Sequence, residues 1–288
     1  MITLLDGPLG TELNARSVAT DLPLWSAAAI EQAPGAIAQI HEDYAASGAH
    51  VHTANTFRTQ RRTVGNQWKR LTAHAVKLAR DSAPTSHRVA GSIAPLEDCY
   101  SPELSPGKAS RDEHREMAQC LAACGCDLLL CETYPIAEEG IVAVEEAVAT
   151  GVQTWVSFTA GPDANLMTPS ELSLAGRQAV DAGASAVMVN CTPATKTLEF
   201  VQALNDAKLG VPIGAYANAG CPEEKIGWNT SSRGTAVYAQ LAQYWIDAGA
   251  TIVGGCCGTG PSHIAELAKR FEGLLARGGA TDASATGD

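Results

Sequence analysis

Four segments of the chain share a pattern in which a helical stretch ends at a glycine and an apolar run follows. The four glycines are Gly48, Gly125, Gly183 and Gly249, and each stands where the glycine that ends a helix is expected. They are spaced roughly 60 to 80 residues apart, about the length of two strand–helix units. The pattern therefore predicts parallel strands that are connected through helices.

Four more apolar runs fall between these segments and complete a set of eight predicted strand regions. They are Ile2–Gly7, Ala46–Phe57, Arg88–Leu96, Ala123–Thr133, Thr154–Ala160, Asp181–Cys191, Pro212–Gly220 and Asp247–Cys257. Near-continuous apolar runs are typical of parallel strands that are buried on both faces. The intervening segments, such as Pro34–Ser47 and Glu138–Thr150, are rich in alanine and amphipathic.

Eight strands alternating with eight helices predict an α/β fold of the (β/α)8 TIM barrel type, with residues 1–276 forming a single domain. A doubly wound open sheet is the alternative. That fold usually carries a G-x-G-x-x-G turn after its first strand, and the segment "DGPLGTEL" does not match it. The small, polar residues 277–288 are expected to be a disordered tail.

The composition narrows the possible partners. The chain has 288 residues and a formal net charge of −11, and "TQRRT" (59–63) is its longest basic cluster. Binding to phosphate backbones needs concentrated Lys and Arg, so nucleic acid is excluded as an expected partner. Neither a signal peptide nor an apolar stretch long enough to span a membrane is apparent. We expect a cytoplasmic protein that binds no membrane.

Active-site residues of such a barrel lie at the C-terminal ends of the strands. At these ends the sequence carries three cysteines, two carboxylates and several further polar residues. The candidates are Asp6, Asn55, Glu132, Cys191, Tyr216, Cys256 and Cys257. The barrel would gather these residues, which are far apart in sequence, at one mouth.

The cysteines suggest a metal site. Adjacent side chains on a regular strand point to opposite faces, so Cys256 and Cys257 can serve one site only where the strand becomes irregular. The surrounding glycines at positions 254, 255, 258 and 260 are expected to allow this through backbone angles closed to other residues. Together with Cys191, the pair would offer Zn²⁺ three soft ligands and an open fourth position. The alternatives are a vicinal Cys256–Cys257 disulfide and three buried thiols.

A closed site of four cysteines is less favoured. No C-x2-C pair is present, and Cys131 should point away from the mouth because it precedes Glu132 on the same strand. Cys99, Cys120, Cys124 and Cys221 are interpreted as small core or surface residues that only pack. Three thiolates make zinc a poor Lewis acid for water, but a thiol bound as fourth ligand would lose its proton. Alkyl transfer to that thiol is the favoured chemistry.

The segments "VNC" (189–191) and "GGCCGT" (254–259), preceded by "DGPLGTEL", "TANTF" and "CET", resemble the homocysteine S-methyltransferase family. The resemblance runs from about Leu4 to about Leu275. It implies a zinc-dependent barrel that methylates homocysteine to methionine, with Cys191, Cys256 and Cys257 as the zinc ligands. It further implies that Asp6 and Glu132 bind the homocysteine ammonium group, and that backbone N–H groups near Gly7 receive its carboxylate.

Three positions depart from the family pattern, and one of them, Ala217 where relatives commonly carry proline, is expected to be without consequence. Pro8 replaces a residue that would offer an N–H group, and Arg58 stands where the betaine-using members carry a tyrosine. The expected methyl donor is a small sulfonium cation, S-methylmethionine or S-adenosylmethionine. The alternatives are betaine, a corrinoid protein as donor, a zinc- or thiol-binding module without turnover, and a metal-free lyase or aldolase.

Aromatic side chains near the mouth could hold a cationic donor through cation–π contacts. The candidates, any of which could instead pack in the core, are Trp25, Phe57, Tyr134, Tyr216 and Trp228. His50 and His52 alternate with apolar neighbours and are expected to face the barrel interior or its wall. We interpret them as core histidines, or as residues behind the site, rather than as metal ligands.

Overall fold

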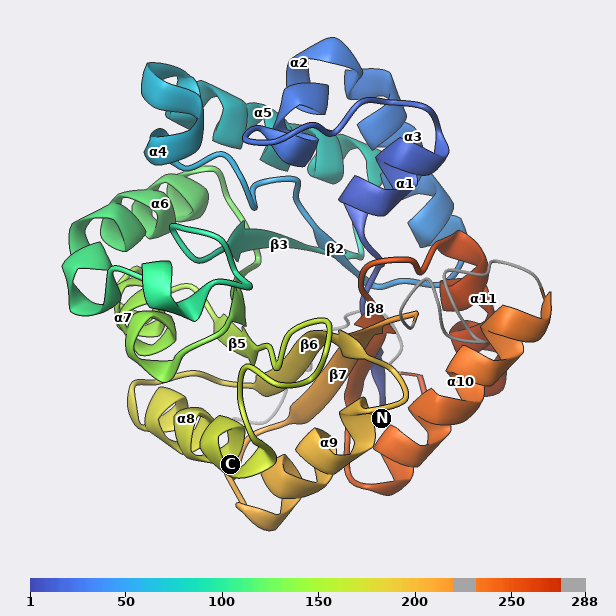
Figure 1. Ribbon diagram of the computed structural model, residues 1–288. Coiled ribbons are helices and arrows are strands. Elements are labelled where there is room, and N and C mark those ends of the chain that lie inside the picture. The colour runs from blue at the N-terminus through green and yellow to red at the C-terminus, as the bar shows by residue number, and fades with distance from the viewer. Residues whose placement is uncertain (220–231, 276–288) are drawn as a thin grey trace, which may run out of the picture.

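The computed structural model describes residues 1–219 and 232–275 as eight parallel strands surrounded by helices (Figure 1). The sheet runs in the order β1-β8-β7-β6-β5-β4-β3-β2, and a bridge between Leu5 and Val51 joins its two ends. The strands are β1 (Thr3–Leu4), β2 (Val51–Thr53), β3 (Arg88–Ile93), β4 (Leu128–Tyr134), β5 (Thr154–Phe158), β6 (Val187–Pro193), β7 (Ile213–Asn218) and β8 (Ile252–Gly255).

Helices form a ring outside the strands (Figure 1). The α-helices are α1 (Leu9–Ala15), α2 (Ala29–Gln32), α3 (Pro34–Ala46), α4 (Arg61–Val64), α5 (Trp68–Ser82), α6 (Arg111–Ala123), α7 (Ala137–Val148), α8 (Pro169–Asp181), α9 (Thr197–Asp206), α10 (Ser232–Asp247) and α11 (Pro261–Arg270). Four short 3-10 helices lie in the connections: η1 (Trp25–Ala28), η2 (Gly65–Gln67), η3 (Pro102–Leu104) and η4 (Gly107–Ser110).

The four glycines that the sequence places at helix ends have the expected left-handed backbone. Their φ angles are +100° at Gly48, +78° at Gly125, +105° at Gly183 and +109° at Gly249. Each chain reversal is followed by an even-numbered strand, namely β2, β4, β6 or β8. A side chain at these positions would strain the backbone, which explains why glycine recurs there.

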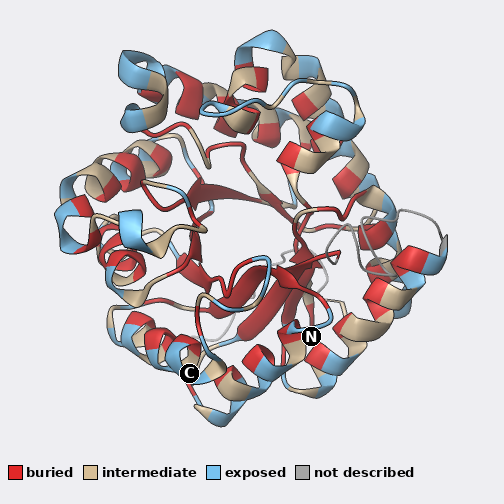
Figure 2. Ribbon diagram, in the orientation of Figure 1, coloured by how far each residue is buried: buried red, intermediate tan, exposed pale blue. Residues whose placement is uncertain are grey.

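Alternation along the strands divides the apolar residues into two layers. Leu128 and Leu130 of β4 pack inside the barrel, whereas Leu129 and Cys131 pack against the helices. Cys131 therefore points away from the mouth, as predicted. The strands are buried apart from the half-buried Thr3, Thr53 and Arg88, and the helices bury the side that faces the strands (Figure 2).

The fold confirms the predicted (β/α)8 barrel, with all eight strands found in the predicted regions. The alternative of an open doubly wound sheet is wrong, because the hydrogen bond from the Asp6 N–H to the Val51 carbonyl (3.0 Å) helps to close the barrel. The predicted tail, residues 277–288, lies outside the described residues. Within the described ranges, no helix has the length and hydropathy needed to cross a membrane.

Candidate active site

A cavity of about 450 Å³ opens at the C-terminal ends of the strands. All the residues predicted for substrate and metal line it. They are Asp6, Gly7, Trp25, Asn55, Glu132, Cys191, Tyr216, Cys256 and Cys257. Closure of the barrel thus brings residues from β1, β2, β4, β6, β7 and β8 to one pocket.

The three predicted cysteines form a cluster. Cys191 and Cys256 are in direct disulfide contact, with their Cα atoms 5.7 Å apart, and Cys257 is a free thiol. All three sulfur atoms lie within 4.8 Å of one another. The alternative of a vicinal Cys256–Cys257 disulfide is therefore wrong. Three clustered sulfurs beside an open cavity fit a thiophilic cation such as Zn²⁺.

Irregular strand ends direct two of the site residues. The β6–β7 register shifts between Asn190 and Pro193, and Cys191 has a φ angle of +49°. The β4–β5 register shifts between Cys131 and Tyr134, and Thr133 has a φ angle of +66°. Bulges of this kind re-aim side chains, and left-handed angles at non-glycine residues occur often at functional sites.

The glycines around Cys256 mostly lack the unusual backbone angles that we expected. Only Gly258 has a left-handed backbone, with a φ angle of +78°. Gly254 and Gly255 are needed for space, because an added Cβ would lie 2.6 Å from the Leu5 Cβ or 2.1 Å from the Thr259 Oγ1. Close packing, rather than unusual backbone angles, therefore explains most of this glycine cluster.

The side chain of Asn190 forms a hydrogen bond to the Cys191 sulfur. Its amide nitrogen donates to Cys191 Sγ (3.4 Å) and to Thr133 Oγ1 (2.8 Å), and its oxygen accepts from Ser157 Oγ (2.8 Å). Asn190 was not among the site residues predicted from the sequence.

Two buried carboxylates lie in the same cavity. Asp6 accepts hydrogen bonds from the Thr53 N–H (2.7 Å) and Thr53 Oγ1 (3.1 Å). Glu132 accepts from Ser92 Oγ and from the Tyr216 hydroxyl (3.0 Å). Burial raises the pKa of both carboxyls, more strongly than these hydrogen bonds lower it. Neither forms an ion pair within the described ranges, so a cationic ligand would compensate their charge.

The histidines near Asp6 supply no positive charge. His41 of α3 and His52 of β2 offer nitrogen atoms within 4.8 Å of the Asp6 carboxylate. Burial lowers the pKa of His41 to about 4, and burial together with neighbouring histidines lowers that of His52 to about 3. His52 faces the helices, where its Nε2 contacts His87 Nδ1 at 3.0 Å, so it lies in the barrel wall and not inside the barrel.

Trp25 and Phe57 form an aromatic edge of the cavity, with ring centroids 5.7 Å apart in a T-shaped arrangement. Asn55 holds this edge in place, because its side chain accepts from Ser26 Oγ (2.6 Å) and donates to the Ser26 carbonyl (2.8 Å). Tyr134, in contrast, is buried outside the cavity and donates to the Ile93 carbonyl, so its expected place at the mouth is wrong. Trp228 and Cys221 lie outside the described residues.

One wall of the cavity was not predicted from the sequence. Asp98, Cys99 and Tyr100, in the loop after β3, line it together with the three clustered cysteines. Cys99 is therefore more than a packing residue remote from the site. Its position depends on a loop conformation that no strand or helix pattern encodes.

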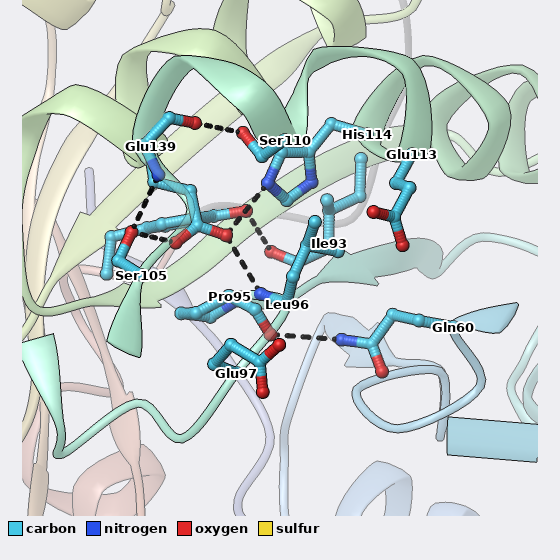
Figure 3. Close-up of polar contacts among 12 residues, drawn as sticks. Gln60, Ile93, Pro95, Leu96, Glu97, Ser105, Ser110, Glu113, His114 and Glu139 are labelled. Atoms are coloured by element: carbon cyan, nitrogen blue, oxygen red, sulfur yellow. Dashed lines mark hydrogen bonds and ion pairs between the residues drawn. The ribbon is translucent and has the colours of Figure 1, made fainter. Parts of the chain in front are cut away.

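A buried glutamate of α7 holds this loop (Figure 3). Glu139 accepts hydrogen bonds from the Leu96 N–H (2.8 Å), from Ser105 Oγ and from His114 Nε2 (3.1 Å). Burial raises the pKa of Glu139, but the hydrogen bonds from His114, Ser105 and Leu96 outweigh it and leave the pKa lowered. The ionised carboxylate thus fastens both ends of the loop to the helix layer.

The barrel gathers three cysteine sulfur atoms and two carboxylates, which have no ion-pair partner among the described residues, in one pocket, an arrangement that suits an enzyme acting on small polar molecules. The family model for homocysteine S-methyltransferase matches residues 3–271. The chain therefore belongs to the homocysteine S-methyltransferase family, a family of methyltransferases.

Individual relatives agree with this assignment. The homocysteine S-methyltransferase of Escherichia coli (strain K12) is 30% identical and aligns with 93% of this chain and 95% of its own length. The homocysteine S-methyltransferase YbgG of Bacillus subtilis (strain 168) is 28% identical, with 93% of each chain covered. The metallated form of the homocysteine methyltransferase MmuM from Escherichia coli is a structural neighbour. It has a TM-score of 0.78 and 27% identity, and the match covers 93% of this chain and 96% of that one.

Proposed function

We propose that this protein is a zinc-dependent S-methyltransferase that moves a methyl group from a small sulfonium compound to homocysteine, giving methionine. One observation carries the proposal: three sulfur atoms within 4.8 Å of one another share a cavity with two buried carboxylates that have no positive partner among residues 1–219 and 232–275. Thiols suit a thiophilic metal, and the carboxylates suit the ammonium group of an amino acid.

Cys191, Cys256 and Cys257 would hold the zinc ion. Bound there, zinc lowers the pKa of a coordinating thiol and keeps the sulfur available as a nucleophile. The metallated form of the MmuM neighbour supports the presence of a metal in this family. The Asn190 amide would stabilise the Cys191 thiolate by donating a hydrogen bond to its sulfur.

Asp6 and Glu132 would orient the acceptor. Both are buried in the pocket, and a homocysteine ammonium group between them would offset the cost of burying their charge. Tyr216 holds Glu132 through its hydroxyl, and Thr53 holds Asp6 with two hydrogen bonds. These contacts fix the amino end of the acceptor, so that its thiol is directed at the cysteine cluster.

The chemical step would be a direct displacement. The homocysteine sulfur attacks the methyl carbon of the sulfonium, a new S–C bond forms, and the donor C–S bond breaks. The electron pair of the broken bond leaves with the donor, which departs as a neutral thioether. The thiol proton is released to solvent beforehand, so the step needs no general base.

The donor would enter along the aromatic edge formed by Trp25 and Phe57. Aromatic rings attract cations with about 0.5–2 kcal/mol each, and they exclude water from the methyl group. A thioether is a much weaker base than a tertiary amine and is therefore the better leaving group, which makes a sulfonium a better methyl donor than the quaternary ammonium of betaine. S-methylmethionine and S-adenosylmethionine are therefore the donors to test first.

The test combines metal analysis with a product assay on protein purified under reducing conditions. Homocysteine is offered separately with S-methylmethionine, S-adenosylmethionine and betaine, and methionine is measured. We expect about one zinc per chain, as in a three-thiolate catalytic site, and methionine from a sulfonium donor. Chelation of the metal should abolish the product, and added zinc should restore it.

Two outcomes would contradict the proposal. Reduced, folded protein that takes up no zinc would exclude the metal site. Zinc-loaded protein that forms no methionine from any of the three donors would exclude sulfonium-dependent transfer and favour a corrinoid-protein donor or a thiol-binding module without turnover. Methionine formed with betaine alone would support homocysteine as the acceptor but would show that the methyl donor is betaine and not a sulfonium.

A further inference from the structure

Arg58 lies at the rim of the cavity, just beyond the end of β2. It is half-buried, and the central carbon of its guanidinium group is 5.4 Å from the centroid of the Phe57 ring. Its Nη1 donates a hydrogen bond of 3.3 Å to the Glu97 carbonyl. The side chain is therefore held over the aromatic edge of the pocket.

The neighbouring arginines differ from Arg58 in their partners. Arg61 forms an ion pair with Glu116 (3.0 Å), and Arg62 forms ion pairs with Glu97 and Glu113. Within residues 1–219 and 232–275, no carboxylate forms an ion pair with Arg58. Arg58 thus presents a positive charge with free N–H donors to a cavity whose inner end is acidic.

This placement affects the kind of cation that the rim can accept. The guanidinium lies over the Phe57 ring, and its charge would repel a ligand that carries only positive charge. A ligand with a carboxylate as well as a sulfonium would instead pair with it. Guanidinium and carboxylate groups match in geometry, because two N–H donors can meet two oxygens.

We propose that Arg58 binds a carboxylate of the methyl donor, so that this enzyme selects sulfonium compounds that also carry a carboxylate. This inference rests on the proposed function and specifies its substrate class. Arg58 would then be a residue that determines donor specificity, with no part in the chemistry at the sulfur.

The carboxylate of homocysteine is the other anion that could reach the pocket. In an α-amino acid the carboxylate and the ammonium share one carbon atom, so an arginine that bound it would lie close to Asp6 and Glu132. The charge of Arg58 instead acts on Cys99, whose pKa burial raises to about 12 and Arg58 lowers to a smaller extent. The Nη1 of Arg58 donates to the carbonyl of Glu97, which directly precedes the cavity-lining residues Asp98, Cys99 and Tyr100. Arg58 therefore belongs to the outer wall, on the donor side.

The test compares two donors that differ only in the carboxylate. They are S-methylmethionine and dimethyl(3-aminopropyl)sulfonium, in which hydrogen replaces the carboxylate group. For the wild-type enzyme we expect a KM that is about 10- to 100-fold lower for S-methylmethionine, the range of one charge-assisted hydrogen-bonded pair. In Arg58→Gln, the KM for S-methylmethionine should rise by about the same factor, with kcat little changed.

The KM for the donor without the carboxylate should stay constant or fall in Arg58→Gln, because a repelling charge is removed. Arg58→Lys should give an intermediate KM for S-methylmethionine, since it keeps the charge but loses the two-pronged geometry. Arg61→Gln is the matched control, because Arg61 is an exposed arginine of the same segment that does not line the cavity. It should leave both KM values unchanged. If S-adenosylmethionine is the donor, its decarboxylated form replaces the second compound.

Equal KM increases for both donors in Arg58→Gln would overturn the inference and indicate a structural role. A rise in the KM for homocysteine alone would also overturn it, by assigning the acceptor carboxylate to Arg58. Failure of the proposed function looks different, since the wild-type enzyme would then form no methionine from either sulfonium. In that case, each donor is titrated calorimetrically into the zinc-loaded wild type and into zinc-loaded Arg58→Gln. Binding that requires the donor carboxylate and is lost in Arg58→Gln supports the inference. Binding that depends neither on the carboxylate nor on Arg58 overturns it.

Discussion

The two walls of the cavity are built in different ways. The inner wall consists of strand ends and carries Asp6, Glu132 and the cysteine cluster, with positions that are fixed by the hydrogen bonds of the barrel. The outer wall consists of connections, including Trp25, Phe57, Arg58 and the loop at 98–100. Side-chain contacts such as those of Asn55 and Glu139 hold it in place.

This difference suggests a division of labour. Strand ends hold groups rigidly, which suits a metal and an acceptor that must be aligned for displacement. Loops vary without disturbing the barrel, which suits the selection of one donor among several. Substitutions in the inner wall should therefore abolish the reaction, whereas those in the outer wall should change its donor or its efficiency.

The largest effect is expected at the cysteine cluster. Cys256→Ser removes one of the three sulfur ligands. Loss of a residue that merely hydrogen-bonds a metal ligand lowers metal affinity by up to about 100-fold, so loss of a ligand itself should lower the zinc affinity by at least that factor. Methionine formation should fall below detection. Zinc content and the absorption spectrum of the cobalt-substituted protein would measure the loss. Cys120→Ser is the control, because Cys120 lies on α6 outside the cavity and should leave both quantities unchanged.

A smaller effect is expected at Glu132, and it has two opposite parts. Glu132→Gln removes the charge that would pair with the acceptor ammonium, so the KM for homocysteine should rise by about 10- to 100-fold. The same change should raise the melting temperature at pH 7.5 by about 2 to 4 °C for each kcal/mol of relieved burial cost. Thermal unfolding and steady-state kinetics measure the two parts.

The pH dependence of stability tests the expected stabilisation by Glu132→Gln. The pKa of Glu132 is raised in the folded protein, so the protonated form is favoured there. The free energy of unfolding should fall as the pH rises from the ordinary carboxyl pKa through the raised value. Glu132→Gln should lose this part of the pH dependence. A variant that is less stable than the wild type at pH 7.5 would contradict the account.

The smallest effect is expected in the outer wall. Glu139→Gln keeps the size of the side chain but removes the charge that accepts from Leu96, Ser105 and His114, so the free energy of unfolding should fall by about 1–3 kcal/mol. The KM for the donor should rise while zinc content and the KM for homocysteine stay unchanged. Urea denaturation and kinetics with both substrates test this.

The pKa of Glu139 is lowered in the fold, so its stabilisation is present above the ordinary carboxyl pKa and is lost as the pH falls through the lowered value. The wild type and Glu139→Gln should therefore converge in stability in acid. Glu138→Gln is the control on the same helix, since Glu138 is exposed. Equal losses of donor and acceptor affinity in Glu139→Gln would show that the two walls are not independent.

Much of the inner wall was predictable from the sequence. Period-2 alternation placed Cys131 outside and Glu132 inside, and the order of strands brought Cys191, Cys256 and Cys257 to one end. The prediction failed where backbone detail mattered. The expected left-handed angles at Gly254 and Gly255 are absent there, whereas Cys191 and Thr133 adopt them instead. Strand bulges depend on packing between neighbouring strands, which a single strand pattern does not encode.

The sequence by itself determined the barrel, the family and the residue types of the site. Helix-ending glycines, apolar runs and short motifs are local signals, and eight repeats of one unit leave few topologies open. Only the tertiary structure decided that Cys191 contacts Cys256, that Cys99 reaches the pocket and that Arg58 forms no ion pair with a carboxylate of the described part of the chain. These features depend on contacts between residues far apart in the chain. Glu139, for example, fixes a loop that begins more than 40 residues before it in the chain. The outer wall therefore depends on tertiary contacts that local sequence patterns do not encode.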